Sequence, residues 1–340
     1  MPRILVVAPN WIGDALMAQP LLARLRETRP GIKLDVLAPD WVAPVARRMP
    51  EVDEVIAVPF RHRALQLGSR WRLGRTLRER GYSEAIVLPN SWKAALVPFF
   101  ARIPSRRGYI GESRYGLLNR VYRKPDKAMR RHYARLAEAP DAEPHQPLPE
   151  ACLRVDAAHA AATRASFGIE GRYAVLCPGA EYGPAKRWPA RHFAELADQL
   201  AARGYQVWLV GSDKDAAITA EVRRLAHAPC VDLAGRTTLD EAIDLLSLAA
   251  HVVTNDSGLM HIAAALDRPT AAIFGSSSPD FTPPLSAHAR VISLRLSCSP
   301  CFARVCPLGH TNCLVTLEPR RVLDSMNKGS DTVFEKENGE

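Results

Sequence analysis

The sequence predicts an α/β protein with two Rossmann-like domains that face a cleft. Three observations favour this fold class. Short apolar runs alternate with stretches of helical spacing through most of the chain, a pattern typical of parallel sheets covered by helices. The chain has 340 residues, which is more than a single domain usually holds. A polar segment with four prolines, residues 139–150, separates two halves that each show the alternation and is interpreted as a linker.

The two halves are expected to repeat one architecture. In residues 1–150, apolar runs that read as strands cover residues 4–8, 34–37, 55–58 and 85–88. Between them, residues 14–28 and 71–80 have the spacing of amphipathic helices. In residues 151–326, the corresponding strand-like runs cover residues 174–177, 207–210, 252–254 and 270–274. Residues 327–340 are polar and are expected to form a frayed tail.

Composition and charge narrow the class of protein. Hydrophobic residues make up 47% of the chain and charged residues 24%, as in ordinary globular proteins. No apolar run is long enough to span a bilayer, and the N-terminus lacks a signal-peptide pattern, so we expect a cytoplasmic protein. The net charge is +9, and residues 1–150 carry 26 Lys and Arg against 15 Asp and Glu. Such a surface attracts a polyanion: nucleic acid, an anionic membrane or a phosphorylated substrate. The alternative is that the arginines only keep the protein soluble and bind no polyanion.

Residues 254–261, Thr-Asn-Asp-Ser-Gly-Leu-Met-His, are the most informative segment of the second half. They follow a strand-like run and precede a helical one. Asp256 or Ser257 can act as the helix N-cap, and Gly258 lets a ligand approach the backbone closely. A helix that begins in this way directs free N–H groups at one point, which suits a diphosphate. His261 lies one turn into the same helix. The alternative is a capped turn with a packed histidine.

A second loop of this half strengthens the nucleotide hypothesis. Residues 178–189, rich in glycine and proline, follow the run at 174–177, and Lys186 lies within them. A lysine at the carboxyl end of a strand is well placed for an anionic ligand, although a lone lysine is more often a solvated surface charge. Two such loops after strands and before helices indicate a nucleotide site at the edge of a parallel sheet.

The first half carries a candidate catalytic carboxylate. The loop after residues 4–8 is not the G-x-G-x-x-G dinucleotide fingerprint. Gly13 and Asp14 stand where the next helix is expected to begin, so Asp14 can serve as an N-cap or as a favourable charge in the first turn. The carboxyl end of the first strand is also where an open sheet binds its ligand, and there a carboxylate can act as general base toward an acceptor hydroxyl.

Four cysteines form a cluster near the C-terminus, which we call the cysteine cluster: Cys298, Cys301, Cys306 and Cys313. With His310 among them they could bind zinc. The spacing does not match a standard zinc ribbon or finger, and a cytosolic location argues against disulfides. We therefore favour reduced structural thiols and assign no metal.

Six motifs together resemble one family, the ADP-heptose:lipopolysaccharide heptosyltransferases of glycosyltransferase family 9. They occur in order over most of residues 1–325, at residues 10–14 (Asn-Trp-Ile-Gly-Asp), 88–93 (Leu-Pro-Asn-Ser-Trp-Lys), 111–119, 178–189, 255–261 and 277–285. The resemblance implies a GT-B fold and inverting transfer that requires no metal or other cofactor. It implies ADP-L-glycero-D-manno-heptose as donor and the first heptose of the lipopolysaccharide inner core as acceptor.

The resemblance also implies roles for individual residues. The family's catalytic aspartate corresponds to Asp14 and its diphosphate-contacting lysine to Lys186, which is also expected to share in catalysis. The remaining donor-binding positions are expected at Gly13, Gly179, Ala180, Asp256, Ser257, Gly258 and His261. The cysteine cluster is not part of every member's pattern.

The charge asymmetry fits the acceptor that the resemblance implies, an anionic lipid A–Kdo–heptose on the inner face of the inner membrane. We expect the acceptor to be bound by four arginines of the basic first half, Arg61, Arg63, Arg120 and Arg123, and the enzyme to be peripheral to that membrane. Two alternatives stay open. One is a related transferase that uses a Kdo or another heptose acceptor. The other is a basic zinc-containing nucleic-acid-binding protein. The sequence argues against this class, because its basic residues lack interleaved aromatics and no nucleic-acid motif is apparent.

Overall fold

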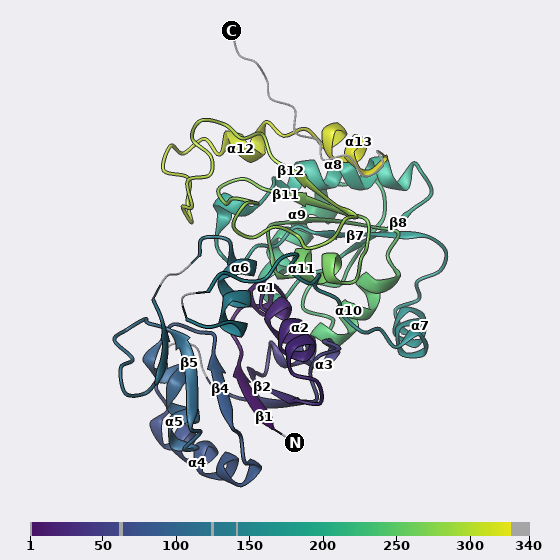
Figure 1. The fold of residues 1–340 in the computed structure, drawn as a ribbon. Coiled ribbons are helices and arrows are strands. Elements are labelled where there is room, and N and C mark those ends of the chain that lie inside the picture. Colours follow the sequence, from purple (N-terminus) through teal and green to yellow (C-terminus); the bar gives the residue numbers. More distant parts are fainter. Residues whose placement is uncertain (1, 61–63, 124–125, 141, 328–340) are drawn as a thin grey trace. The chain divides into compact units, whose positions relative to one another are not determined.

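The computed structural model describes residues 2–60, 64–123, 126–140 and 142–327. The chain divides into two compact units, Met1–Arg154 and Val155–Glu340, whereas the sequence placed the boundary four residues earlier. Each unit is an open, fully parallel sheet of six strands with flanking helices (Figure 1). The chain therefore has the two-domain α/β architecture of the GT-B type, as the sequence predicted.

The first sheet has the strand order β3-β2-β1-β4-β5-β6. Its strands are β1 (Arg3–Val7), β2 (Lys33–Pro39), β3 (Glu54–Val58), β4 (Glu84–Val87), β5 (Ser105–Tyr109) and β6 (Arg120–Tyr122). Successive side chains of a strand point to opposite faces, so β1, which is apolar from Ile4 to Val7, serves two layers of core. On one face, Leu5 and Val7 belong to the same core cluster as Leu77 and Val97 from two helices.

The helices of the first unit connect these strands. They are α1 (Ile12–Met17), α2 (Gln19–Thr28), α3 (Ala43–Arg48), α4 (Leu67–Leu77), α5 (Leu96–Phe100) and α6 (Met129–Ala134), with 3-10 turns η1 (Arg78–Arg80), η2 (Trp92–Ala95) and η3 (Arg135–Ala137). The predicted helix over 14–28 is in fact two helices, α1 and α2. Pro20 is in the first turn of α2, where its missing N–H costs no hydrogen bond, so the second helix starts there.

The second sheet repeats the same topology, in the order β12-β11-β10-β7-β8-β9. Its strands are β7 (Tyr173–Cys177), β8 (Gln206–Leu209), β9 (Cys230–Asp232), β10 (His251–Asn255), β11 (Thr270–Ile273) and β12 (Ala289–Ile292). In both sheets the order reverses beside the first strand of the unit, between β1 and β4 and between β7 and β10. These reversals are the positions at which open α/β sheets bind ligands.

The second core forms between this sheet and its helices. Leu176 and Val253 of the two central strands join Phe193 and Leu196 of α8 in one buried cluster, with Leu323 of α13 at its edge. The helices are α7 (Ala157–Ser166), α8 (Ala190–Ala201), α9 (Ala216–Leu225), α10 (Leu239–Leu248), α11 (Gly258–Ala265), α12 (Asn312–Val315) and α13 (Pro319–Asn327), with 3-10 turns η4 (Pro184–Lys186) and η5 (Asp213–Asp215).

All eight predicted strands are confirmed to within two residues at their ends, but four strands were missed: β5, β6, β9 and β12. The segment predicted as a linker has no helix or strand in its described residues. It is fastened to the first unit, because Arg24 donates to the carbonyls of His145 and Pro147, and Arg130 donates to those of Leu148 and Pro149. The predicted tail lies outside the described residues, except for Asn327, which ends α13.

Candidate active site

A buried polar cluster lies at the strand-order reversal of the second sheet. Lys186 ends the 3-10 turn that follows β7, and its Nζ lies 2.5 Å from Oδ2 of Asp256, which follows β10. Ser277, from the loop after β11, donates its hydroxyl to the same carboxylate oxygen at 2.5 Å. Asp256 and Ser277 are buried, at 6% and 8% exposure, whereas Lys186 is half-buried. Three loops from adjacent strands therefore hold one lysine at the edge of the sheet.

Asn255 braces the two loops of this cluster. Its side-chain oxygen accepts a hydrogen bond from the backbone N–H of Trp188 at 3.0 Å, and its Nδ2 donates to the carbonyl of Pro178 at 2.8 Å. Trp188 is fully buried, and its indole N–H donates to the carbonyl of Leu317. Because both ends of the residue 178–189 loop are tied to β10 in this way, the position of Lys186 is fixed.

Helix α11 begins at this cluster with an uncapped N-terminus. Ser257 is the N-cap residue, but its side chain makes no capping hydrogen bond; its Oγ lies 3.2 Å from Oγ1 of Thr254 instead. Asp256, the other predicted cap, is engaged by Lys186 and Ser277. Ser257 and Gly258 are half-buried, so the first amides of this eight-residue helix can reach an anionic ligand beside Lys186.

His261 lies inside the second core rather than at its surface. It is 5% exposed, and burial lowers its pKa to about 4, with opposing contributions from the nearby charges of Asp256 and Lys186. The imidazole is therefore neutral at pH 7. This is the environment of the packed histidine that the sequence left as the alternative, although the ring is close enough to the Lys186–Asp256 pair to be affected by both charges.

Gly179 and Ala180 shape the start of the same loop. A Cβ on Gly179 would lie 2.3 Å from the carboxylate of Asp215, so only glycine leaves room there. Asp215 is held by the N–H and hydroxyl of Ser212, at 3.0 and 2.9 Å. Ala180 is buried, and its carbonyl accepts from the Arg187 guanidinium. The loop therefore passes close under Lys186 in a single conformation.

Tyr182 places a second cation beside Lys186. The ammonium of Lys186 lies 5.1 Å from the centre of the Tyr182 ring, and the guanidinium of Arg304 lies 5.0 Å from it. The Tyr182 hydroxyl donates to the carbonyl of Phe302 at 2.7 Å, which secures the ring. Two cations on one aromatic ring raise the positive potential at this edge of the sheet.

In the first unit, Asp14 lies in the first turn of α1, directly after β1. The N-cap is Trp11, so the predicted capping role of Asp14 is wrong, whereas its place as an acidic residue in the first turn is confirmed. Tyr133 of α6 lies near it: burial, and secondarily the charge of Asp14, raise the pKa of this phenol well above its ordinary value. Gly13 precedes Asp14 inside the helix and is half-buried.

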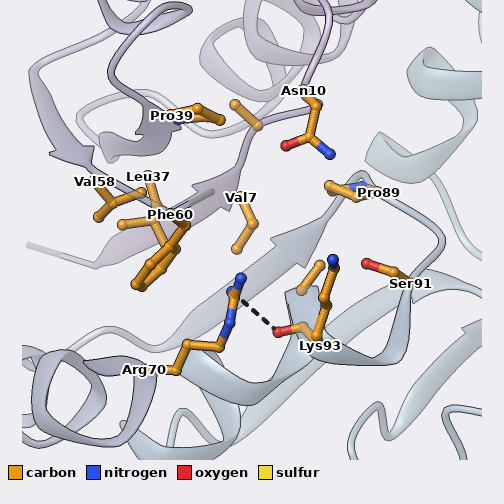
Figure 2. A pocket seen from close by; sticks show the side chains of 12 residues that line it. Val7, Asn10, Leu37, Pro39, Val58, Phe60, Arg70, Pro89, Ser91 and Lys93 are labelled. Atoms are coloured by element: carbon orange, nitrogen blue, oxygen red, sulfur yellow. Dashed lines mark hydrogen bonds between the residues drawn. The ribbon is translucent and has the colours of Figure 1, made fainter. Parts of the chain in front are cut away.

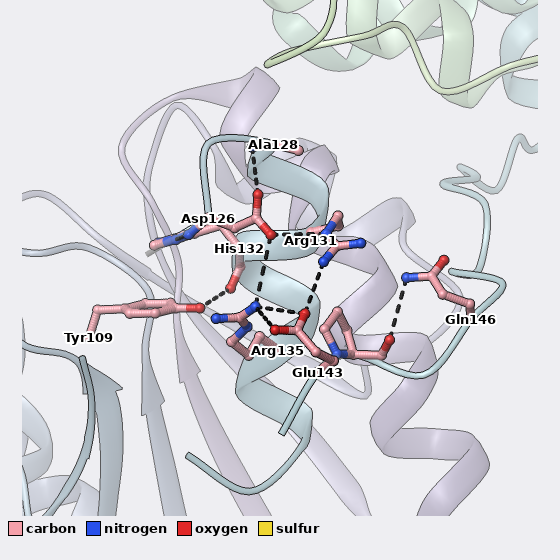
Figure 3. Close-up of polar contacts among 9 residues, drawn as sticks. Tyr109, Asp126, Ala128, Arg131, His132, Arg135, Glu143 and Gln146 are labelled. Atoms are coloured by element: carbon pink, nitrogen blue, oxygen red, sulfur yellow. Dashed lines mark hydrogen bonds and ion pairs between the residues drawn. The ribbon is translucent and has the colours of Figure 1, made fainter. Parts of the chain in front are cut away.

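A polar network holds α6, the helix that carries Tyr133, in place (Figure 3). Arg131 and Arg135 both bind the carboxylate of Glu143, at 2.9 and 2.7 Å, and Arg131 also binds Asp126 at 2.9 Å. The ring of His132 stacks on Tyr109 with 3.9 Å between ring centres. Burial lowers the pKa of His132 to about 4, so it is neutral in this network.

Comparison with known proteins identifies the family. The sequence pattern of glycosyltransferase family 9 (heptosyltransferase) matches residues 70–312. The chain is 46% identical to lipopolysaccharide heptosyltransferase 2 of Escherichia coli K12, covering 96% of this chain and 97% of that protein. The chain belongs to glycosyltransferase family 9. It is also 46% identical to lipooligosaccharide heptosyltransferase 2 of Haemophilus influenzae, over 86% of this chain and 88% of that one.

Solved structures of the family agree with this assignment. The structure of E. coli ADP-heptose LPS heptosyltransferase II matches with a TM-score of 0.86 and 44% identity, over 96% of this chain and 97% of that chain. As a family 9 member the protein is a glycosyltransferase and a heptosyltransferase by class, as the sequence predicted. The roles of its individual site residues stay predictions.

Of the four arginines predicted to bind the acceptor of this family 9 enzyme, two lie in the described parts of the chain. Arg61 and Arg63 lie outside the described residues. Arg120 and Arg123 are exposed on and just after β6, the edge strand farthest from β3 in the sheet. In the strand order they are well separated from β1, which precedes Asp14. Arg120 and Arg123 therefore stay candidates for contacts with a part of the acceptor that is distant from Asp14.

Three residues of the cysteine cluster lie in the loop between β12 and α12, and Cys313 lies in α12. The four thiols are free; Cys313 is buried, Cys301 is exposed, and Cys298 and Cys306 are intermediate. Burial, and then the neighbouring thiols of the cluster, raise the pKa of Cys313 to about 11. Backbone N–H groups, led by that of Thr311, lower the pKa of Cys306. Across the described ranges, which include all four cysteines, no three His, Cys, Asp or Glu side chains are arranged to hold a metal ion.

Sequence reasoning missed three contributors to these sites. Ser277 belongs to a quoted family motif, but nothing in its local pattern indicates that it binds Asp256. Tyr182 lies in the same loop as Lys186. An aromatic residue close to a lysine in the sequence was the signal that could have indicated their contact. Arg70 is one of the 26 basic residues of the first half, and nothing in its local pattern indicates that only 7% of it is exposed. Within the described parts of the chain, no helix is long and apolar enough to cross a membrane.

Proposed function

We propose that this family 9 enzyme transfers L-glycero-D-manno-heptose from ADP-heptose to the first heptose of the lipopolysaccharide inner core. The observation that carries the proposal is the Lys186–Asp256–Ser277 cluster at the strand-order reversal of the second sheet. The named relatives, which cover nearly the whole chain at 46% identity, support the substrates.

The second unit is proposed to hold ADP. Lys186 lies beside the half-buried N-terminus of α11, where the amides of Ser257 and Gly258 add partial positive charge. Asp256 fixes the ammonium but does not neutralise its whole surface, because Lys186 has three donors and its side chain is still 17% exposed. Gly179 keeps the loop close to this point, so a diphosphate can contact backbone and lysine together.

The first unit is proposed to supply the base. Asp14 follows β1 at the carboxyl edge of its sheet, where an acceptor hydroxyl is expected. In the reaction, the acceptor oxygen forms a bond to the anomeric carbon while the bond from that carbon to the ADP oxygen breaks. The proton of the acceptor hydroxyl passes to the Asp14 carboxylate. A single displacement of this kind inverts the anomeric configuration.

The negative charge that develops on ADP is proposed to be balanced by protein groups. Lys186 and the amides at the start of α11 are already in place before the reaction, so no reorganisation is needed as the charge appears. On this basis we propose that the enzyme requires no metal and no other cofactor. The cysteine cluster is assigned a structural role only.

The acceptor and the location are proposed from charge. The anionic lipid A–Kdo–heptose acceptor is attracted by the excess of basic residues in residues 1–150, and we propose that the enzyme is cytoplasmic, works at the inner face of the inner membrane and does not bind nucleic acid. Arg61, Arg63, Arg120 and Arg123 are the proposed acceptor contacts.

The decisive experiment measures ADP release from ADP-heptose with and without a deacylated inner-core saccharide that ends in its first heptose. Acceptor-dependent ADP release and a product larger by one heptose are expected. A matched saccharide that ends in Kdo, without heptose, serves as the control. Transfer to the Kdo-terminated saccharide, and not to the heptose-terminated one, would refute the proposed acceptor and favour the related transferase.

A further inference from the structure

An open hollow of about 530 Å³ lies at the strand-order reversal of the first sheet (Figure 2). It is lined by residues that follow β1, β3 and β4, including Asn10, Phe60 and Ser91. Asn10 is four residues before Asp14, so the hollow and the proposed base share one edge of the sheet.

One wall of the hollow carries a buried arginine. Arg70 of α4 is 7% exposed, and its guanidinium lies 4.1 Å from the centre of the Phe60 ring. Its Nε donates to the carbonyl of Leu65 at 2.7 Å and its Nη1 to the carbonyl of Lys93 at 3.3 Å. These contacts orient the guanidinium but do not neutralise it, because both acceptors are uncharged.

A second cation faces the same space. Lys93 of η2 is half-buried, and Figure 2 shows its ammonium directed into the hollow, between Ser91 and the guanidinium of Arg70. Asn10 lies across from it with its amide also turned inward. Among the residues that the structure describes, no carboxylate forms an ion pair with Arg70 or Lys93. This contrasts with Arg29, Arg80 and Arg107 of the same unit, which all bind carboxylates.

Two cations that have no counter-ion among the described residues are costly in a hollow that is also lined by apolar side chains, among them Val7, Leu37 and Val58. An anion bound between them would offset that cost, with the planar guanidinium offering a forked donor set and the ammonium a point charge. Burial lowers the pKa of Arg70, but a guanidinium stays protonated at any pH at which the protein is folded.

We propose that Arg70 and Lys93, with Asn10, form a binding site for an anionic oxygen group, phosphate or carboxylate, of the acceptor saccharide. This inference rests on the proposed function, because it takes the acceptor to be an anionic sugar. The site would set which sugar hydroxyl reaches Asp14, since it anchors the saccharide a few residues away on the same loop. It differs from the exposed Arg120 and Arg123 proposed above, because Arg70 is buried within the fold.

The test measures saccharide binding directly by titration calorimetry, without donor, so that it does not depend on turnover. Lys93→Gln is compared with Arg72→Gln, which removes one positive charge from an exposed position on the same α4 that carries Arg70. The ligand is the deacylated heptose-terminated saccharide in three forms: intact, freed of phosphate, and with its carboxylates methyl-esterified. Arg70→Lys is the second variant, and melting temperatures confirm that all three proteins are folded.

We expect Lys93→Gln to raise Kd for the intact saccharide roughly 10- to 100-fold, as for loss of one charge-assisted hydrogen bond. Arg72→Gln should change it less than about 3-fold. Arg70→Lys keeps the charge but loses the fork, so it should also weaken binding. Removing or esterifying one kind of group on the saccharide should weaken its binding to the wild-type protein but not its binding to Lys93→Gln. That group is the one bound in the hollow.

Equal effects of Lys93→Gln and Arg72→Gln would overturn the inference, and so would a Lys93→Gln protein that responds to both chemical modifications as the wild type does. Failure of the proposed function is recognised separately, by the lack of acceptor-dependent ADP release from the wild-type protein while the saccharide still binds.

Discussion

The pairing of Lys186 with Asp256 predicts that removing the lysine damages both stability and function, and that the two effects can be separated. Asp256 is 6% exposed and has Lys186 and Ser277 as its polar partners at 2.5 Å each. Lys186→Ala leaves that carboxylate buried with one neutral donor. Breaking a buried ion pair in this way costs about 3–5 kcal/mol.

The structure favours the lower end of this range. The Lys186 side chain is 17% exposed, so water can partly replace it beside the carboxylate. A loss of about 3 kcal/mol corresponds to a fall of roughly 6–12 °C in the melting temperature of a unit of this size. Scanning calorimetry of the second-unit transition measures it.

The double variant Lys186→Met/Asp256→Asn separates the two roles. It removes both charges, so most of the lost melting temperature should return, while ADP affinity and kcat/KM should stay low because the ammonium of Lys186 no longer faces the diphosphate. The expected functional loss for either variant is about 2–4 kcal/mol in kcat/KM. A double variant that regains ADP affinity together with stability would refute the reasoning, and so would a Lys186→Ala protein that melts within about 1 °C of wild type.

Three further predictions follow from the same sites. Asp14→Asn should lower kcat by about 10²–10⁴-fold with little change in ADP affinity or melting temperature, and near-normal turnover would remove Asp14 from the mechanism. Enzyme treated with EDTA should keep most of its activity, because Lys186 and the start of α11 hold the diphosphate; loss of activity that zinc or magnesium restores would contradict this. Burial lowers the pKa of His261 and of His132 to about 4, so the unfolded chain binds more protons between pH 4 and about 6.5. The stability that the two neutral histidines contribute is therefore complete above pH 6.5. As the pH drops toward 4, this contribution falls by up to about 1.4 kcal/mol per pH unit for each histidine. His132→Gln should flatten that dependence in denaturant titrations, and an unchanged slope would show that the histidine is not buried neutral.

The sequence by itself determined the fold class and eight strands, seven inner strands and the edge strand β3. Buried parallel strands are apolar on both faces, so segments such as Ile4–Val7 and Tyr173–Cys177 are visible as continuous apolar runs. Two of the four missed strands, β5 and β9, were invisible for the opposite reason. β5 (Ser-Arg-Arg-Gly-Tyr) and β9 (Cys-Val-Asp) carry polar side chains, and they are strands because a neighbouring strand supplies their hydrogen-bond partners.

The loops at the two strand-order reversals were also found from sequence, because glycine, proline and a polar residue after an apolar run mark the carboxyl end of a strand. Which side chains bind one another at those loops was decided only by the tertiary structure. Lys186 meets Asp256 across 70 positions of sequence, and Ser277 joins them from a third strand. The same limit hid Arg70: its charge was plain in the sequence, but only the packing of α4 against the sheet buries it beside Lys93. Local pattern encodes which face of an element is apolar; the order of strands, which brings distant loops to one edge, depends on the contacts of the whole chain.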